Sequence, residues 1–156
     1  QIVTRDDPTA RFIRLKLAPL ILTLAFRLRA VRKLAFLTLS QTNVNYREGA
    51  LAEGSAGRVR AGDRLPWVRE ANNFAGLKQL AWQGQVFGEL EPGLADACAE
   101  AGLALDRFLW TPAAADAGYE RGAFHLVRPD GYVSLIAAKG AAGALSNYKA
   151  RHELTF

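Results

Sequence analysis

Few side chains in this sequence have the chemistry of a catalyst. The chain holds one cysteine, Cys98, and two histidines, His125 and His152. Histidine is the usual acid or base near neutral pH, and the thiolate is the reactive form of cysteine. Cys98 lies in an alanine-rich segment, and no spacing pairs it with a histidine. We expect Cys98 to be a small buried hydrophobe, His125 to be a non-catalytic strand residue, and His152 to lie at a frayed surface.

Motifs that hold cofactors or metals are missing from the sequence. No two of its 14 glycines are two residues apart, and Gly-Lys does not occur, so both the dinucleotide fingerprint and the P-loop are absent. One cysteine and two distant histidines do not make a zinc set or a Cys-x-x-Cys redox pair. We predict no catalytic residue, no cofactor-binding residue and no metal ligand in this chain. The single cysteine also favours a reducing, cytoplasmic compartment.

The chain divides into three zones, and the first is predicted to be helical. Asp7 and Pro8 suit the start of a helix, and Pro19 predicts a kink or a second start. Across residues 20–41, apolar side chains fill two flanks between two polar stripes, which indicates a helix packed on two sides. The uncharged run at residues 17–26 is too short to cross a bilayer, which needs about 20 residues. We therefore predict no transmembrane segment.

The second and third zones are a connector and a mixed α/β region. Residues 42–75 contain Gly49, Gly54, Gly57 and Gly62, which indicates an irregular connector. The remaining predictions are a short helix at 74–80, a strand at 85–90, a helix at 94–101 ended by Gly102, a strand at 103–110, strands at 123–127 and 132–137 joined by a tight turn, and a closing helix at 141–152.

The order of these elements indicates the fold class. A βαβ unit followed by an antiparallel hairpin and a helix is the thioredoxin-like arrangement. We therefore predict an α/β protein, with a thioredoxin-like domain over residues 61–156. A helical arm and connector over residues 1–60 would precede it. Fold alone does not fix function.

Positive charge is concentrated in the first half of the chain. Residues 1–70 hold 13 Lys/Arg against 6 Asp/Glu, and the whole chain carries +5. Such a basic half suits nucleic acid, an anionic membrane surface, an absent protein partner, or simply a solvated face. The aromatics near the basic cluster, Phe26 and Phe36, lie among leucines rather than at stacking positions. We therefore expect no nucleic-acid partner.

Three short motifs, in order, resemble one enzyme family. They are Val-Asn-Tyr-Arg at 44–47, Ala-Gly-Asp-Arg-Leu-Pro at 61–66, and Val-Arg-Pro-Asp-Gly-Tyr-Val at 127–133. Their order and spacing are similar to the C-terminal part of FAD-dependent aromatic-ring monooxygenases, the phenol hydroxylase and chlorophenol monooxygenase group. In that family the second motif opens a thioredoxin-like C-terminal domain without a redox cysteine pair. The residues that carry the resemblance are Tyr46, Arg47, Gly62, Asp63, Arg64, Pro66, Arg128, Pro129, Asp130 and Gly131.

The resemblance implies a piece of a larger flavoprotein. The family's flavin motifs are absent, so no catalytic or FAD-binding residue is carried over, and FAD and NAD(P)H are implied for the parent enzyme alone. The lack of methionine and the start at Gln1 agree with a processed or trimmed chain. The chain would pack against the flavin domain or a second subunit, possible homodimers included. Structural roles are expected for the motif residues: Asp63 and Arg64 pair or cap backbone, Arg128 braces the turn, and Gly131 supplies a positive φ.

Two other functions compete with this one. The first is a free-standing thioredoxin-like binding module, without redox cysteines, whose basic helix docks on an acidic partner or a membrane surface. The second is a small enzyme that uses His125, together with Asp130. Of the three hypotheses, the enzyme has the least sequence support.

Overall fold

The computed structural model describes residue 15 and residues 44–156. The predicted helical arm lies outside these residues, apart from Leu15. Residues Val44–Phe156 form one compact unit. This unit begins before the boundary expected at residue 61, because residues 44–60 pair with the rest of the domain through their backbone. For example, Glu53 N–H donates to Ser134 O at 2.8 Å, and Ile136 N–H donates to Glu53 O at 2.9 Å.

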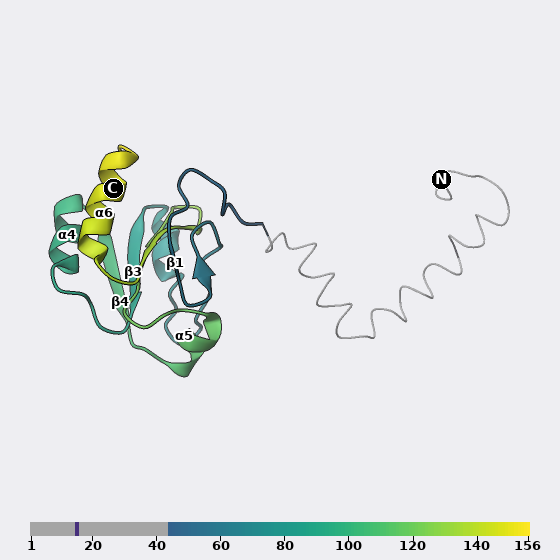
Figure 1. The fold of residues 1–156 in the computed structure, drawn as a ribbon. Helices are drawn as coiled ribbons and strands as arrows, with labels where there is room; N and C mark the ends of the chain where they lie inside the picture. The colour runs from purple at the N-terminus through teal and green to yellow at the C-terminus, as the bar shows by residue number, and fades with distance from the viewer. Residues whose placement is uncertain (1–14, 16–43) are drawn as a thin grey trace. The chain divides into compact units, whose positions relative to one another are not determined.

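A four-stranded mixed sheet organises the unit (Figure 1). Its strands are β3 (Gln83–Phe87), β4 (Ala104–Phe108), β5 (Phe124–Val127) and β6 (Val133–Ala137), in the spatial order β4-β3-β5-β6. β3 and β4 are parallel, and β5 is antiparallel to both of its neighbours. The predicted βαβ unit and hairpin are therefore present, and the fold is α/β.

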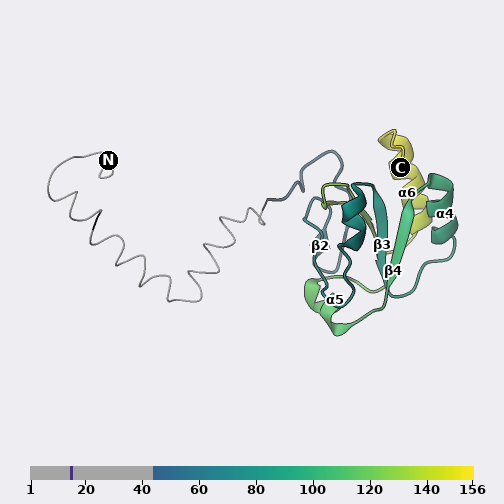
Figure 2. The same cartoon turned by 180° about the vertical axis from the view of Figure 1, so that it is seen from behind.

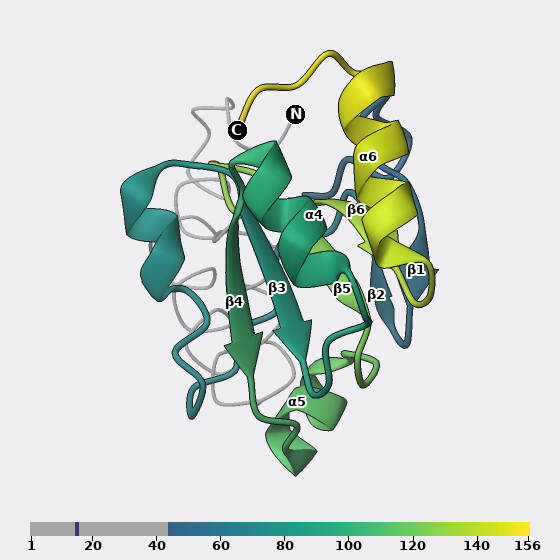
Figure 3. The same ribbon diagram turned by 90° about the vertical axis from the view of Figure 1, so that its left-hand side faces the viewer.

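Two helices cover one face of this sheet. α4 (Leu94–Ala101) connects β3 to β4, and α6 (Ala141–Arg151) follows β6. They lie side by side (Figure 3). α4 has the predicted bounds and ends at Gly102, whose φ of +75° suits a glycine C-cap. α6 ends one residue before the predicted position.

The remaining elements are short. η2 (Ala75–Gln79) is a 3-10 helix that precedes β3 and is seen in front of the strands in Figure 2. α5 (Pro112–Ala117) lies between β4 and β5. A two-stranded antiparallel ribbon, β1 (Ser55–Ala56) and β2 (Val59–Arg60), forms within the connector that we expected to be irregular. Neither α5 nor this ribbon was predicted from the sequence.

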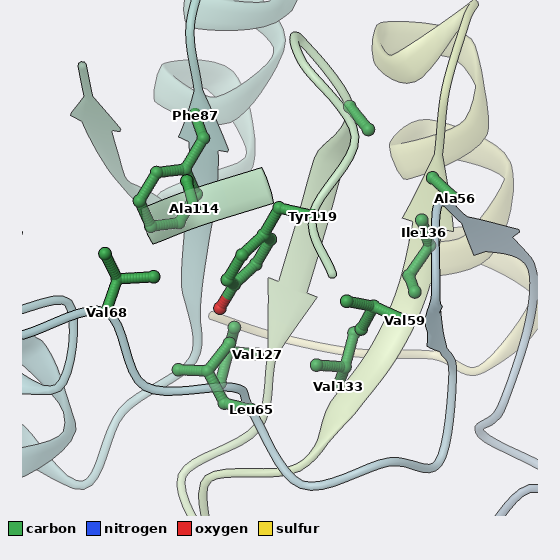
Figure 4. Packing of buried hydrophobic residues seen from close by; sticks show 11 residues of the cluster. Ala56, Val59, Leu65, Val68, Phe87, Ala114, Tyr119, Val127, Val133 and Ile136 are labelled. Carbon is green, nitrogen blue, oxygen red and sulfur yellow. The ribbon is translucent and has the colours of Figure 1, made fainter. Parts of the chain in front are cut away.

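The sheet separates two hydrophobic clusters. We call the first the ribbon-side cluster, since Ala56 of β1 and Val59 of β2 belong to it. Figure 4 shows ten of its labelled residues, with the Tyr119 ring at the centre. The helix-side cluster consists of Val86, Leu94, Cys98, Leu103, Phe124, Leu126, Leu135, Ala137, Ala141, Leu145 and Tyr148.

The alternation of side chains along β5 assigns its residues to the two clusters. Phe124 and Leu126 belong to the helix-side cluster, whereas Val127 belongs to the ribbon-side cluster. His125 points to the opposite face from Phe124 and Leu126, because successive strand residues face opposite sides of a sheet. This places its imidazole beside Tyr119 of the ribbon-side cluster, with 5.0 Å between the ring centroids.

Candidate functional site

The three sequence motifs meet at one place, which we call the motif junction: residues 46–47, 62–66 and 128–132. Backbone hydrogen bonds join the three segments. Tyr46 N–H donates to Gly62 O at 2.7 Å, and Leu65 N–H donates to Gly131 O at 2.9 Å. Arg64 forms an isolated antiparallel bridge with Tyr132. Segments that are 16 residues apart (Tyr46 and Gly62) and 66 residues apart (Leu65 and Gly131) in sequence therefore form one continuous backbone network.

Arg47 and Asp63 form a two-pronged ion pair within the junction. Arg47 Nε donates to Asp63 Oδ1 at 2.6 Å, and a terminal guanidinium nitrogen donates to Oδ2 at 3.1 Å. Asp63 Oδ2 also accepts from the backbone N–H of Arg60 at 3.1 Å. Asp63 thus pairs and caps backbone, as expected, but its partner is Arg47. Arg64 is exposed and contributes its backbone bridge.

Gly62 lets the first two motifs approach each other. Its φ is +86°, and a Cβ at this position would overlap Arg47 N and the carbonyl of Tyr46. An L-residue would therefore be strained here both by its backbone conformation and by the lack of space. The presence of glycine at position 62 of the second motif therefore has a purely steric explanation.

The third motif forms the turn between β5 and β6. Gly131, with φ +80°, donates its N–H to Arg128 O at 2.9 Å across Pro129 and Asp130. The Arg128 guanidinium bonds Asp130 Oδ2 at 2.7 Å, and Tyr132 N–H donates to Asp130 Oδ1 at 3.3 Å. The expected positive φ at Gly131 is confirmed, and Arg128 braces the turn through Asp130.

Two tyrosines and an arginine complete the junction. The rings of Tyr46 and Tyr132 meet edge to face, with 4.8 Å between their centroids. The Arg128 guanidinium carbon lies 5.9 Å from the Tyr46 ring centroid, within cation–π range. Beside them is a hollow of about 150 Å³, lined by Tyr46, Arg128, Gly62 and residues 49–52. Pockets for drug-sized ligands have roughly 300–1,000 Å³, so the junction binds its own segments and leaves little room for a ligand.

Pro66 joins the junction to a buried polar network that was not predicted from the sequence. The Pro66 carbonyl accepts from Tyr119 Oη at 2.7 Å and from Asn73 Nδ2 at 3.0 Å. Asn73 Nδ2 is also 3.1 Å from Tyr119 Oη, and Gln85 Nε2 donates to Asn73 O at 2.7 Å. Burial raises the pKa of Tyr119. These neutral, mutually bonded groups position the segment before η2.

His125 borders this network and is fully buried in β5. Its Nδ1 lies 3.1 Å from Ala123 O, and Nε2 has no hydrogen-bond partner among the described residues. Burial lowers the pKa of His125 to about 4, so the ring is neutral at pH 7. Asp130, the suggested catalytic partner, instead bonds Arg128 and the Tyr132 backbone in the exposed turn. The structure therefore offers no support for a His125–Asp130 pair.

Cys98 is buried in α4, as expected, and is 1% exposed. Burial raises the pKa of its thiol to about 11. The reactive thiolate is thus scarce at neutral pH. Its neighbours in the helix-side cluster are apolar, so Cys98 acts as a packing residue.

His152 does not lie at a frayed surface, and that prediction is wrong. Its side chain is 16% exposed, and Nε2 lies 2.9 Å from Glu53 Oε1. Its ring packs against Tyr148, with 4.5 Å between centroids. The bond to His152 lowers the pKa of Glu53, and Arg151 adds to this effect. The end of α6 is thus fixed to the segment that precedes β1.

Comparison with known proteins leaves the family open. No protein-family model matches the chain, and no curated protein matches it.

Residues 15 and 44–156 contain no group of three or more His, Cys, Asp or Glu side chains placed to hold a metal ion. Within the same residues, no helix has both the length and the apolar character needed to cross a membrane.

Proposed function

We propose that this chain is the C-terminal, thioredoxin-like portion of a FAD-dependent aromatic-ring monooxygenase. Its role would be to pack against the flavin and substrate portion or a second subunit, without catalysing a reaction itself. The motif junction carries the proposal, because three motifs that resemble this family by order and spacing also form one hydrogen-bonded unit. If the three motifs matched the family by chance, there would be no reason for the segments that contain Gly62, Asp63 and Gly131 to be bonded to one another.

The sheet topology supports the thioredoxin-like assignment. That arrangement requires a parallel βαβ pair beside an antiparallel hairpin, with a final helix returning over the sheet. The order β4-β3-β5-β6 and the positions of α4 and α6 meet this requirement. A redox role on such a fold needs a low-pKa thiol at a helix start. Cys98, buried within α4 with a raised pKa, lacks that environment.

FAD does not fit the hollow at the motif junction. The hollow at the motif junction has about 150 Å³, far below what a dinucleotide occupies, and the sequence has no dinucleotide fingerprint. Under this proposal FAD and NAD(P)H belong to other parts of the parent enzyme. The residues described here contribute packing and hydrogen bonds, not electron transfer.

Two measurements test the proposal. Sequencing the gene is expected to show a Gly-x-Gly-x-x-Gly segment upstream in the same reading frame, and a complete gene without one contradicts the proposal. Incubating the chain with FAD and removing free flavin by gel filtration is expected to leave a colourless protein. Stoichiometric retained flavin would overturn the non-catalytic role.

The basic N-terminal region supports a second candidate. Residues 1–70 carry a net charge of +7, which suits a binding module that docks on an acidic partner or an anionic membrane. Most of that charge lies outside the described residues. Binding to anionic lipid vesicles that weakens with salt would favour this candidate, whereas no binding at low salt would eliminate the membrane-docking form of it.

A further inference from the structure

The outer edge of β4 has no strand beside it in the described part of the chain. β4 is the terminal strand of the sheet, and Figure 3 shows it at the border, next to β3. Within residues 15 and 44–156, β3 alone pairs with it. The residues of β4 are exposed or half-buried, whereas all five residues of β3 are buried. The backbone N–H and C=O groups that point away from β3 can therefore pair with a further strand.

The geometry of β4 suits such pairing. Its five residues pair with β3 in continuous register, without a bulge or a proline. Prolines and bulges are common devices that keep other chains from an edge strand. Leu109, which directly follows the strand, is an apolar side chain that is 83% exposed. A regular, open edge of this kind is where extended peptides add to a sheet.

The two charged residues of β4 argue against a second copy of this chain as the occupant. Directly opposite residues of an antiparallel pair have their side chains on the same face of the sheet. A symmetric pair centred on the middle of β4 therefore brings together two copies of Asp106 or two copies of Arg107. Like charges in these positions destabilise the pair. A different peptide, with a positive residue opposite Asp106, avoids this repulsion.

A cleft of about 380 Å³ lies between this edge and η2. Ala104, Asp106 and Phe108, alternate residues that share one face of β4, line one side of it. An added strand would place every second side chain on this same face. Those side chains would meet the three β4 residues, because opposite residues of paired strands are neighbours. The cleft therefore determines which side chains the added strand can carry.

The lining of the cleft favours a basic side chain. Asp106 is the charged residue of the lining, and it has no ion-pair partner within residues 15 and 44–156. A Cβ on Gly76 would lie 2.0 Å from Gln83 Oε1 and 3.3 Å from Asp106 Oδ2, so two acceptor oxygens meet beside this glycine. Ammonium and guanidinium groups only donate hydrogen bonds and therefore match these acceptors. Trp82 and Phe108 provide aromatic surface for the apolar stem of such a side chain.

We propose that the free edge of β4 binds an extended peptide of a partner protein, which adds as an antiparallel strand and places a lysine or arginine in the cleft beside Asp106. The residues two positions before and after this basic residue would be apolar, since they face Ala104 and Phe108. The surface is separate from the motif junction and does not depend on the proposed packing role.

A titration of the full ¹⁵N-labelled chain with the peptide acetyl-Thr-Val-Thr-Lys-Thr-Val-Thr-amide tests the proposal. Its two valines and its lysine share one face when the peptide is extended. In ¹⁵N–¹H NMR spectra we expect saturable shifts at the amides of β4 and at the Trp82 indole. The absence of such shifts would overturn the proposal.

Two control peptides separate the contributions of charge and backbone. The peptide with glutamate in place of lysine is expected to bind at least about tenfold more weakly, since it places a carboxylate beside Asp106. The lysine peptide with every backbone nitrogen methylated keeps its side chains but cannot donate to β4, and we expect no shifts from it. Equal binding of the glutamate peptide would refute the basic pocket, and equal binding of the methylated peptide would refute strand addition.

Substitutions in the protein locate the charge. Asp106→Asn is expected to weaken binding of the lysine peptide at least about tenfold, and Asp106→Lys to reverse the preference so that the glutamate peptide binds better. Asp96→Asn, on the exposed side of α4, is the matched control and should leave the affinity unchanged. The same spectra show whether each variant is folded. A folded Asp106→Asn with wild-type affinity for the lysine peptide would contradict the assignment.

Discussion

The buried imidazole of His125 makes the stability of this domain depend on pH. Its pKa is about 4 in the folded protein, because burial disfavours the charged ring, and about 6.5 in an unfolded chain. Between these values the unfolded state binds more protons, so the free energy of unfolding rises with pH. The stabilisation is complete above about pH 6.5 and is lost as the pH falls toward 4. The pKa difference corresponds to about 3 kcal/mol over the whole range.

Urea denaturation at several pH values between 5 and 7 measures this effect. We expect the wild-type free energy of unfolding to fall steadily as the pH decreases across this range. His125→Phe keeps an aromatic ring beside Tyr119 and is expected to flatten the dependence, whereas His152→Gln keeps His125 and should retain it. The pKa values of Glu53, Glu89 and Glu91 are also lowered in the folded protein. They add to the loss of stability only below about pH 4.5, where these carboxyls protonate in the unfolded chain. A slope that is identical in His125→Phe would contradict the assignment.

At the scale of elements, alanine substitutions at two glycines are expected to change the free energy of unfolding in opposite directions, because the surroundings of the two glycines differ. Gly62→Ala places a Cβ against the backbone of residues 46 and 47 at φ +86°. We expect it to reduce the free energy of unfolding by about 1–3 kcal/mol. Gly143→Ala is the matched control, because Gly143 lies inside α6 with nothing near its Cβ position. It should stabilise the protein by about 0.5–1 kcal/mol.

Thermal and urea unfolding of these two variants provides the test. Opposite signs support the close approach of the first two motifs at Gly62. If Gly62→Ala were as stable as the wild type, the backbone of residues 46 and 47 would have to lie farther from Gly62 than the structure places it.

Local signals in the sequence predicted the regular elements well. The αL stop at Gly102 and the Arg128-Pro129-Asp130-Gly131 turn are short-range features, and both α4 and the β5–β6 hairpin were found from them. A short-range signal also marks the start of α5. Thr111 Oγ1 accepts from Ala114 N at 3.2 Å, and Pro112 is at the helix start. We missed α5 because Thr111 and Pro112 directly follow the predicted strand at 103–110.

Contacts between residues that are far apart in the sequence could not be predicted from the residue pattern. The ribbon strands β1 and β2 have two residues each, too few to show a periodicity. Asn73, Gln85 and Tyr119 form their network across 46 residues of sequence. Neutral amides carry no charge pattern that would reveal such pairing. The motif residues were identified by resemblance, but the Arg47–Asp63 pair became visible only in three dimensions.

At the scale of the whole molecule, the connector is part of the domain. Residues 44–60 contribute Ala56 and Val59 to the ribbon-side cluster. Gly62 N–H donates to Val133 O at 2.7 Å, and Ile136 N–H donates to Glu53 O at 2.9 Å. These bonds join the connector to β6, the strand at the edge of the sheet.

Native-state hydrogen exchange tests whether this region unfolds with the rest. We expect the amides of Gly62 and Ile136 to exchange with the free energy of global unfolding, like those of β3 and β5. Leu80 N–H, in the exposed end of η2, should exchange much faster and serves as the internal reference. Exchange of Gly62 and Ile136 at the rate of Leu80 would show that the connector opens independently.

The motif junction also determines how tension would enter the domain. A pull on the chain before Val44 reaches the fold first through Tyr46 N–H and the Arg47–Asp63 ion pair. From Gly62 the load passes to Val133 in β6, not to a free loop. The chain therefore enters the domain at residues that are hydrogen-bonded and ion-paired to the rest of the fold, not at an unbonded loop.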